Sequence, residues 1–172
     1  MIAYKFLRSD GRSVFTGFDW PLPAATPGAW VEAPADPCRS GVHACRASHL
    51  PHWAGRVLYE VELGGRIVEH GDKLAAERGR LVRRIREWDE QRDAYTRMCA
   101  DRAHELVRAA PPEFSHWDAV VEPSISEGPA LLGFVAARIA QEIEGSPDAY
   151  HAERARQARW LAKRLGLAAP RR

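Results

Sequence analysis

The sequence predicts an α+β fold, in which an antiparallel β-rich N-terminal half is followed by about three α-helices packed on it. Residues 57–63 (Val-Leu-Tyr-Glu-Val-Glu-Leu) alternate so that every second side chain is apolar, which is typical of a strand with one buried face. From Trp88 onward, apolar residues recur every three or four positions, which is typical of amphipathic helices. We therefore expect a single domain over residues 1–172, with a β-rich unit at 1–87 and a helical part at 88–172.

Short strands and turns are expected along the first half. The pair Gly64-Gly65 predicts a hairpin turn. Prolines recur through residues 20–37 and favour extended backbone there. Residues 47–53 are expected to form a helical turn, and residues 80–86 either a last strand or the lead into a helix. The expected strands are residues 2–7, 13–15, 29–32, 42–45, 57–63 and 66–69.

Three helices are expected in the second half. The first runs from Trp88 until Pro111-Pro112 stops it. Residues 113–128 are expected to form a loop. The second helix begins near Pro129, because proline suits the first helical turn. The third follows Asp148, which can cap it, and runs to about residue 165.

The composition is that of an ordinary globular protein, with 45% hydrophobic and 28% charged residues. The formal charge of +2 gives no overall basic field, so a nucleic-acid partner is not expected. Three cysteines argue against a disulfide-stapled secreted scaffold. The most apolar window ends at Arg138 and is far shorter than the roughly 20 residues that span a bilayer. We therefore expect a cytosolic protein with no membrane partner.

Reactive side chains concentrate in residues 38–45. His43 is the best acid/base candidate, because an imidazole ordinarily titrates near neutral pH. Cys45 would act as a nucleophile only with a lowered thiol pKa. No metal is expected, since the cysteines and histidines are not spaced as the Cys-x2-Cys or His-x3-His pairs that structural zinc favours. If a metal does bind, its ligands are Cys38, His43, Cys45 and His49. Alternatively, the two thiols are simply buried, and together with one hydrogen-bonded histidine they hold the loop in place.

Charged residues on the expected strands have two interpretations. Glu60 or Glu62 could serve as a general base, although alternating glutamates on a strand usually face solvent. Five arginines in residues 78–86 could bind phosphate or nucleic acid, but no aromatic residues interleave with them, which favours a solvated face. No glycine-rich nucleotide loop or metalloprotease motif is present, so we expect no cofactor.

Aromatic and polar side chains of the first half are expected to form the wall of a groove. This interpretation competes with a simple core role, since tryptophans in a small domain are mostly buried. The expected binding residues are Tyr4, Lys5, Trp20, Trp30, Cys45, Trp53 and Tyr59.

The order of several motifs resembles an uncharacterised family of small bacterial and phage proteins. The motifs are Tyr-Lys-Phe at 4–6, Phe-Thr-Gly-Phe at 15–18, Cys-x-x-Gly-Val-His-x-Cys at 38–45, Leu-Tyr-Glu-Val-Glu-x-x-Gly at 58–65 and Asp-Lys at 72–73. The resemblance covers about residues 2–86. It implies a compact β-rich unit there and no known activity.

A fainter similarity is to the ADP-ribosyltransferase fold. Residues 41–43, the helical turn after them and residues 58–61 follow the order of that fold's elements. The chain lacks the Ser-Thr-Ser motif and a final glutamate strand, which disfavours the use of NAD.

Two functions remain open. The first is a small cytosolic binding domain with a groove around the Cys38–Cys45 loop and the Tyr59 strand, for a small molecule or protein. The second is a small enzyme acting on a nucleotide-like or amide substrate, with His43 as the acid/base and Glu60 assisting. An enzyme requires these polar groups to converge in one concave pocket.

Overall fold

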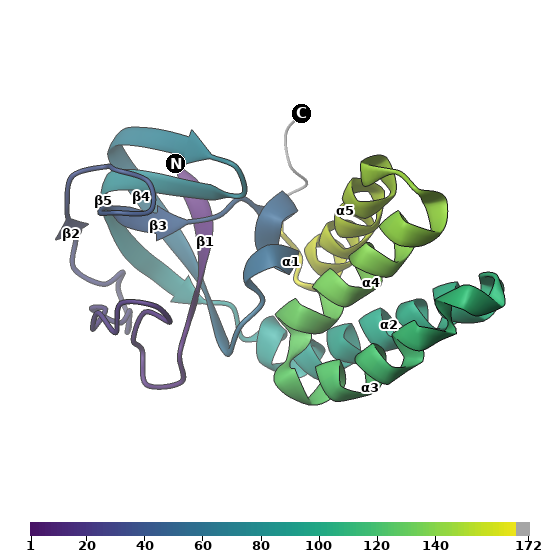
Figure 1. The fold of residues 1–172 in the computed structure, drawn as a ribbon. Coiled ribbons are helices and arrows are strands. Elements are labelled where there is room, and N and C mark those ends of the chain that lie inside the picture. The colour runs from purple at the N-terminus through teal and green to yellow at the C-terminus, as the bar shows by residue number, and fades with distance from the viewer. Residues whose placement is uncertain (168–172) are drawn as a thin grey trace.

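The computed structural model describes residues 1–167, and it confirms the expected α+β class (Figure 1). The last five residues of the helical part that we expected at 88–172 lie outside the described residues. The elements are β1 (Ile2–Leu7), β2 (Val31–Glu32), β3 (Val42–Ala44), the 3₁₀ turn η1 (Ala47–His49), α1 (Leu50–Trp53), β4 (Val57–His70), β5 (Lys73–Arg84), α2 (Glu87–Ala109), the 3₁₀ turn η2 (Pro112–Trp117), α3 (Asp118–Glu127), α4 (Pro129–Glu144) and α5 (Pro147–Arg164).

The sheet is antiparallel and curves until it closes on itself. Along one edge β5 pairs with β4, and along the other it pairs with β3 and then β2. On the far side of β4 lies β1. The ring closes where Tyr4 and Cys45 exchange two backbone hydrogen bonds of 2.9 and 2.8 Å. This closure leaves the sheet with an inner and an outer face.

Each face of the sheet has its own hydrophobic core. The predicted alternation in residues 57–63 is confirmed, since Val57, Tyr59, Val61 and Leu63 share the inner core, which Trp20 covers. Leu58 points the other way and joins Tyr4 and Phe6 in the outer core, where the helices pack. Figure 1 shows the helices gathered on one side of the sheet.

The hairpin predicted at Gly64-Gly65 is wrong, because β4 continues through this pair to His70. The pair instead forms a bulge at which the register with β5 shifts, and Gly65 adopts a φ of 70°. Glycine adopts this left-handed conformation without the strain that a Cβ would add. The turn lies farther on, where Gly71 has a φ of 59° between His70 and its partner Lys73.

The second half contains one helix more than the sequence predicts. Residues 113–128 are predicted to form a loop, yet η2 and α3 occupy most of this stretch, and α3 continues through Pro123. Ser124 follows the proline and donates a 2.7 Å hydrogen bond from its hydroxyl to the carbonyl of Val120. The helices predicted to begin near residues 88, 129 and 148 are confirmed as α2, α4 and α5. Among residues 1–167, no helix has the length and apolar character needed to cross a membrane.

Two other strand predictions also change. Residues 13–15 form no strand; Ser13 makes only an isolated bridge to Leu7. The strand expected at 29–32 shortens to the two residues of β2. Residues 80–86, for which the sequence allows either a last strand or the lead into a helix, mostly belong to β5.

Trp88 connects the sheet to the helices. Its side chain is fully buried; it contacts the ring of Phe6 edge-on at 5.3 Å between centroids and lies 6.0 Å from the Tyr95 ring. Its indole nitrogen donates a 3.1 Å hydrogen bond to the carbonyl of Gly55. One hydrophobic cluster therefore contains side chains from β1, β4 and the helices α1 to α5, which supports the proposal of a single domain.

We expect Trp88→Ala to lower the free energy of unfolding by about 3–5 kcal/mol, because it removes a fully buried indole that both halves contact. Chemical denaturation of Trp88→Ala and of the milder Trp88→Phe, followed by circular dichroism, measures this. Trp30→Ala is the control, since Trp30 is 37% exposed and its loss should cost less than about 1 kcal/mol. Two separate transitions, with the sheet outlasting the helices, would contradict the single-domain proposal.

Candidate functional site: an arginine groove between α2 and α5

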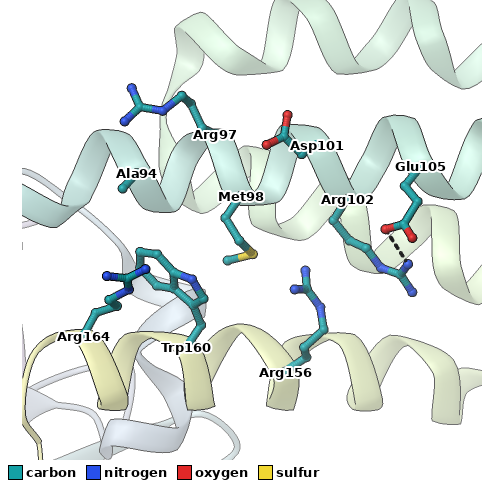
Figure 2. Close-up of a pocket in the computed structure, with 9 residues that line it drawn as sticks. All are labelled: Ala94, Arg97, Met98, Asp101, Arg102, Glu105, Arg156, Trp160 and Arg164. Atoms are coloured by element: carbon teal, nitrogen blue, oxygen red, sulfur yellow. Dashed lines mark hydrogen bonds and ion pairs between the residues drawn. The ribbon is translucent and has the colours of Figure 1, made fainter.

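A groove of about 580 Å³ lies between α2 and α5, and we call it the arginine groove. Figure 2 shows Met98 and Arg102 pointing from α2 toward α5, while Arg156 and Trp160 point from α5 toward α2. The groove is lined by Ala94, Arg97, Met98, Asp101, Arg102, Glu105, Arg156, Trp160 and Arg164.

Positive charge dominates the lining. Four arginines face only two carboxylates, those of Asp101 and Glu105. Among the ion pairs formed within residues 1–167, none involves Arg97 or Arg164. The Arg164 guanidinium lies 5.4 Å from the centre of the Trp160 ring, which gives it an aromatic support and leaves its N–H groups available.

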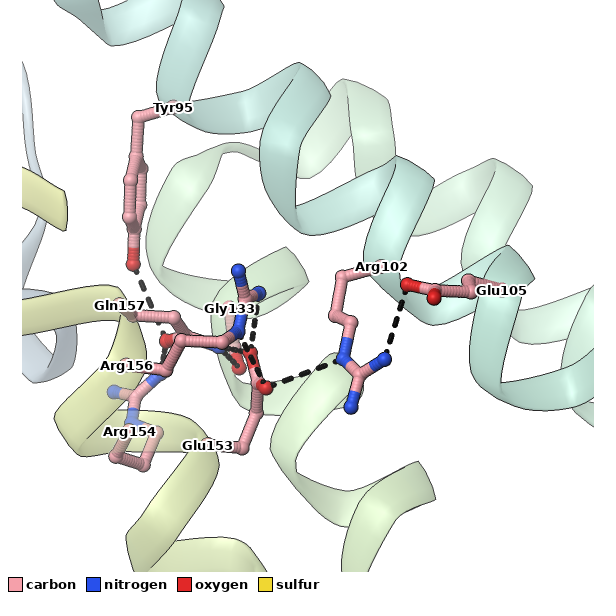
Figure 3. Close-up of polar contacts among 8 residues, drawn as sticks. All are labelled: Tyr95, Arg102, Glu105, Gly133, Glu153, Arg154, Arg156 and Gln157. Atoms are coloured by element: carbon pink, nitrogen blue, oxygen red, sulfur yellow. Dashed lines mark hydrogen bonds and ion pairs between the residues drawn. The ribbon is translucent and has the colours of Figure 1, made fainter.

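A buried carboxylate holds the other two arginines in place. The Glu153 side chain is 3% exposed and accepts two hydrogen bonds from Arg156, of 2.8 and 2.7 Å. Arg102 Nε approaches the same carboxylate at 3.5 Å (Figure 3). The hydrogen bonds to Glu153 raise the pKa of Arg156 further above its already high ordinary value. Glu153 thus fixes two guanidinium groups at the base of the groove before any ligand arrives.

Glu153 belongs to a larger buried network in which Gln157 is the centre. Gln157 Nε2 donates to Glu153 at 3.0 Å and to the carbonyl of Gly133 at 2.9 Å. Its Oε1 accepts from Tyr95 at 3.3 Å and from Arg154 at 3.0 Å (Figure 3). Arg154 is 4% exposed, and its Nε has no hydrogen-bond partner among the described residues. The network therefore places another positive charge behind the groove.

Only part of this groove can be recognised in the sequence. Its lining residues recur at helical spacing, with Arg156, Trp160 and Arg164 four apart, and the expected third helix has an arginine-rich face. The decisive contact joins Arg102 to Glu153 across 51 positions of sequence, and it forms only because α2 packs beside α5.

His43 is bound within its own loop. Its Nε2 accepts a 3.3 Å hydrogen bond from the backbone N–H of Cys38, and the ring also bonds to the backbone of Gly41. Burial lowers the pKa of His43, and the positive charges of Lys5 and Lys73 lower it further. A neutral imidazole that is held by the backbone of its own loop fits the interpretation that the histidine fixes the loop.

Glu60 lies apart from His43. Its carboxylate pairs with Arg83 at 3.0 Å on the outer face of the sheet. In the strand register Glu60 lies opposite Tyr4 and Arg83, whereas His43 lies opposite Ala75. No hydrogen bond or ion pair between described residues joins the two, so the structure does not assemble the proposed acid/base pair.

The seven expected binding residues divide among three places. Lys5, Trp20 and Tyr59 meet at the inner core. Tyr4, Cys45 and Trp53 lie at the outer core, where the Trp53 indole donates to the Asp72 carbonyl at 3.1 Å. Trp30 stands alone at the surface, with the guanidinium groups of two β5 arginines 5.0 and 4.8 Å from its ring centre.

A second groove, of about 630 Å³, lies beside the Cys38–Cys45 loop. None of the expected binding residues lines it. One of its carboxylates, that of Glu77, already accepts a 2.8 Å hydrogen bond from the backbone of Arg66 at the β4 bulge. Its lining consists of Glu32, Ala33, Pro34, Gly65, Glu77 and Arg78.

The arginines of β5 are largely neutralised at the sheet surface. Arg80 pairs with Glu62 at 2.7 Å. Arg83 and Arg84 pair with Glu60 and Asp89 at 3.0 and 2.7 Å. This arrangement matches the solvated face favoured for residues 78–86.

Within the described residues, no three side chains of His, Cys, Asp or Glu form a group that could hold a metal ion. The four zinc ligands considered for the loop are therefore not gathered. Cys45 lies in the outer core beneath the helices, while Cys38 is exposed and adopts a φ of 70°.

We expect iodoacetamide to alkylate the native protein only at Cys38. Burial raises the pKa of both Cys45 and Cys99 to about 12, so neither thiol ionises near neutral pH. Mass spectrometry at pH 8 should find one label in the native protein, three in urea and none in native Cys38→Ser. Labelling of Cys45 at the rate of Cys38 would instead restore it as a candidate nucleophile.

His49 and His52 lie on η1 and α1, with ring centres 6.0 Å apart. His52 Nδ1 lies 3.5 Å from an Asp72 carboxylate oxygen. Burial nevertheless lowers the pKa of His52 to about 4, and the buried charge of Arg154 acts in the same direction. His52 is therefore neutral in the folded protein at neutral pH.

This pKa predicts a loss of stability in acid. The unfolded chain takes up a proton at His52 near pH 6.5 and the folded chain only near pH 4. The free energy of unfolding should fall as pH drops through this window, by on the order of 3 kcal/mol from this residue. His52→Gln should flatten the decline in urea melts, whereas His70→Gln, at an exposed position, should not. Equal slopes for the parent and His52→Gln would contradict the assignment.

Residues 1–93 match the family described as a domain of unknown function, DUF7666. The match covers 93 of 172 residues and includes every strand with the first turns of α2. No curated protein and no solved structure matches the chain. The arginine groove begins at Ala94 and so lies beyond the matched residues. The chain belongs to the DUF7666 family.

Proposed function

We propose that this protein is a binding module that holds a phosphate-bearing small molecule in the arginine groove. The observation that carries this proposal is the buried carboxylate of Glu153, which fixes Arg102 and Arg156 at the base of the groove. Arg97 and Arg164 at the rim add two guanidinium groups that form no ion pair with described residues. Groups oriented in advance lose less entropy when they bind.

The chemistry of the lining favours an organic phosphate. Guanidinium groups match the oxygens of a phosphate in bidentate geometry. Trp160 and Met98 offer apolar surface for the rest of the ligand. Asp101 and Glu105 can accept hydrogen bonds from hydroxyl or amine groups of that ligand. A groove of about 580 Å³ is of the size that small-molecule sites have.

Binding is better supported than catalysis. Among residues 1–167, no histidine, cysteine or lysine lines the groove, so the described lining lacks a side chain that ordinarily titrates or attacks near neutral pH. The alternative hypothesis of an enzyme requires His43 and Glu60 to lie in one pocket. His43 instead bonds to the backbone of Cys38, and Glu60 pairs with Arg83. The expected ligand-binding role is thus kept, but its site moves from the Cys38–Cys45 loop to the helices.

The cytosolic location belongs to the same proposal. All three cysteines are free, as is usual in a reducing compartment. A bacterial or phage source is what the resemblance of the motifs implies.

Titration with inorganic pyrophosphate tests the proposal, with Trp160 as a fluorescent reporter inside the groove. We expect saturable binding that weakens as salt rises, because the attraction is screened. Arg164→Ala and Arg97→Ala should each weaken binding about tenfold, as expected for losing a hydrogen bond to a charged group. Arg159→Ala is the matched control, since Arg159 is an exposed arginine of α5 outside the lining.

Two results would overturn the proposal. One is a parent protein that does not bind pyrophosphate at low salt. The other is an Arg159→Ala variant that loses as much affinity as Arg164→Ala, because binding would then follow the general charge of α5 and not the groove.

A further inference from the structure

The two ends of the arginine groove differ in charge. The helices α2 and α5 run in opposite directions along it, so that Arg97 of α2 and Arg164 of α5 lie at the same end (Figure 2). Both side chains are exposed, and neither forms an ion pair or a side-chain hydrogen bond within residues 1–167. This end therefore carries two positive charges that no described carboxylate neutralises.

At the other end, carboxylates balance the arginines. Arg156 donates two hydrogen bonds to the buried carboxylate of Glu153. Arg102 pairs with Glu105 at 3.0 Å and approaches Glu153 at 3.5 Å. The carboxylate of Asp101 is exposed and forms no ion pair or hydrogen bond with the described residues. The same groove thus offers a negative charge without a partner as well as two positive ones.

Apolar surface separates these charges. Asp101 follows Arg97 by four positions of α2, which places it about 6 Å farther along the helix axis. Figure 2 shows the Arg97 side chain extending away from Asp101, so the charged groups themselves lie farther apart. Met98 and Trp160 lie between the two ends and are partly exposed. The Arg164 guanidinium lies 5.4 Å from the centre of the Trp160 ring, so an anion held there borders the apolar surface.

We propose that the ligand of the arginine groove is a phosphate ester that also carries an amine, with an apolar segment between the two groups. This inference rests on the proposed function, because it takes the phosphate to bind in this groove. The phosphate oxygens accept hydrogen bonds from Arg97 and Arg164. The apolar segment crosses Met98 and Trp160, and the ammonium group donates to Asp101. The opposite charges of the two ends fix the direction in which the ligand lies.

Three compounds of equal chain length test this inference: hexyl phosphate, 6-aminohexyl phosphate and hexane-1,6-diyl bisphosphate. Isothermal titration calorimetry on the full-length protein at neutral pH and low salt gives each affinity. We expect 6-aminohexyl phosphate to bind about fivefold tighter than hexyl phosphate, which is the upper range for an exposed ion pair. The bisphosphate should gain at most about twofold from its two equivalent ends, because its second phosphate meets the like charge of Asp101.

A pair of matched variants locates the effect. Asp101→Asn should bring the affinities of hexyl phosphate and 6-aminohexyl phosphate to within about twofold of each other, because the ammonium group loses its charged partner. Asp93→Asn is the control, since Asp93 is an exposed aspartate of α2 outside the lining. This variant should keep the preference of the parent for the amine.

The outcomes separate this inference from the proposed function. Equal binding of hexyl phosphate and 6-aminohexyl phosphate by the parent would show the inference to be wrong, while binding of pyrophosphate in the same buffer would leave the proposed function standing. A bisphosphate that binds tightest of the three would also contradict the inference, since both ends would then hold anions. If neither these compounds nor pyrophosphate bind, the inference fails together with the proposed function.

Discussion

The outer face of the sheet carries apolar side chains that must be shielded from water, and Trp88 joins this face to the helices that shield it. Trp88 contacts Phe6 of β1 on one side and Tyr95 of α2 on the other. The DUF7666 match ends at residue 93, inside α2, so it includes Trp88 but not the helices that complete its burial. In this chain α4 and α5 supply that cover, and their packing against α2 creates the arginine groove. The groove is thus a by-product of the same burial.

The network beneath the groove is difficult to explain as a stabilising device. A buried ion pair seldom adds net stability, because both charges lose their water. Here Glu153 is held by Arg102 and Arg156, while buried Arg154 pairs with no carboxylate of residues 1–167 and its Nε has no partner among them. Leaving a buried donor unsatisfied costs about 1–3 kcal/mol. Such an arrangement is better explained by the orientation that it imposes on the groove arginines.

Local patterns predicted the elements well, and contacts between distant residues account for what they missed. Alternation placed Val57 and Leu63 on the correct face, because a strand buries every second side chain. The Gly64-Gly65 pair suits a hairpin and a bulge equally, and pairing with β5 decided between them. A loop was predicted at residues 113–128, where α3 instead forms and packs on α2 and α4. The groove forms because α2 packs beside α5, and a pattern within either helix does not predict that packing.

Net charge is a poor guide to this molecule, because its charges are distributed unevenly. The sheet surface pairs Glu60, Glu62 and Asp89 with three arginines of β5. Among residues 1–167, several cationic groups form no ion pair, and they include Arg97 and Arg164 at the rim of the arginine groove and Arg154 buried behind it. Arg97 and Arg164 are exposed to solvent, so they can attract an anion to the groove although the net charge of the chain is only +2.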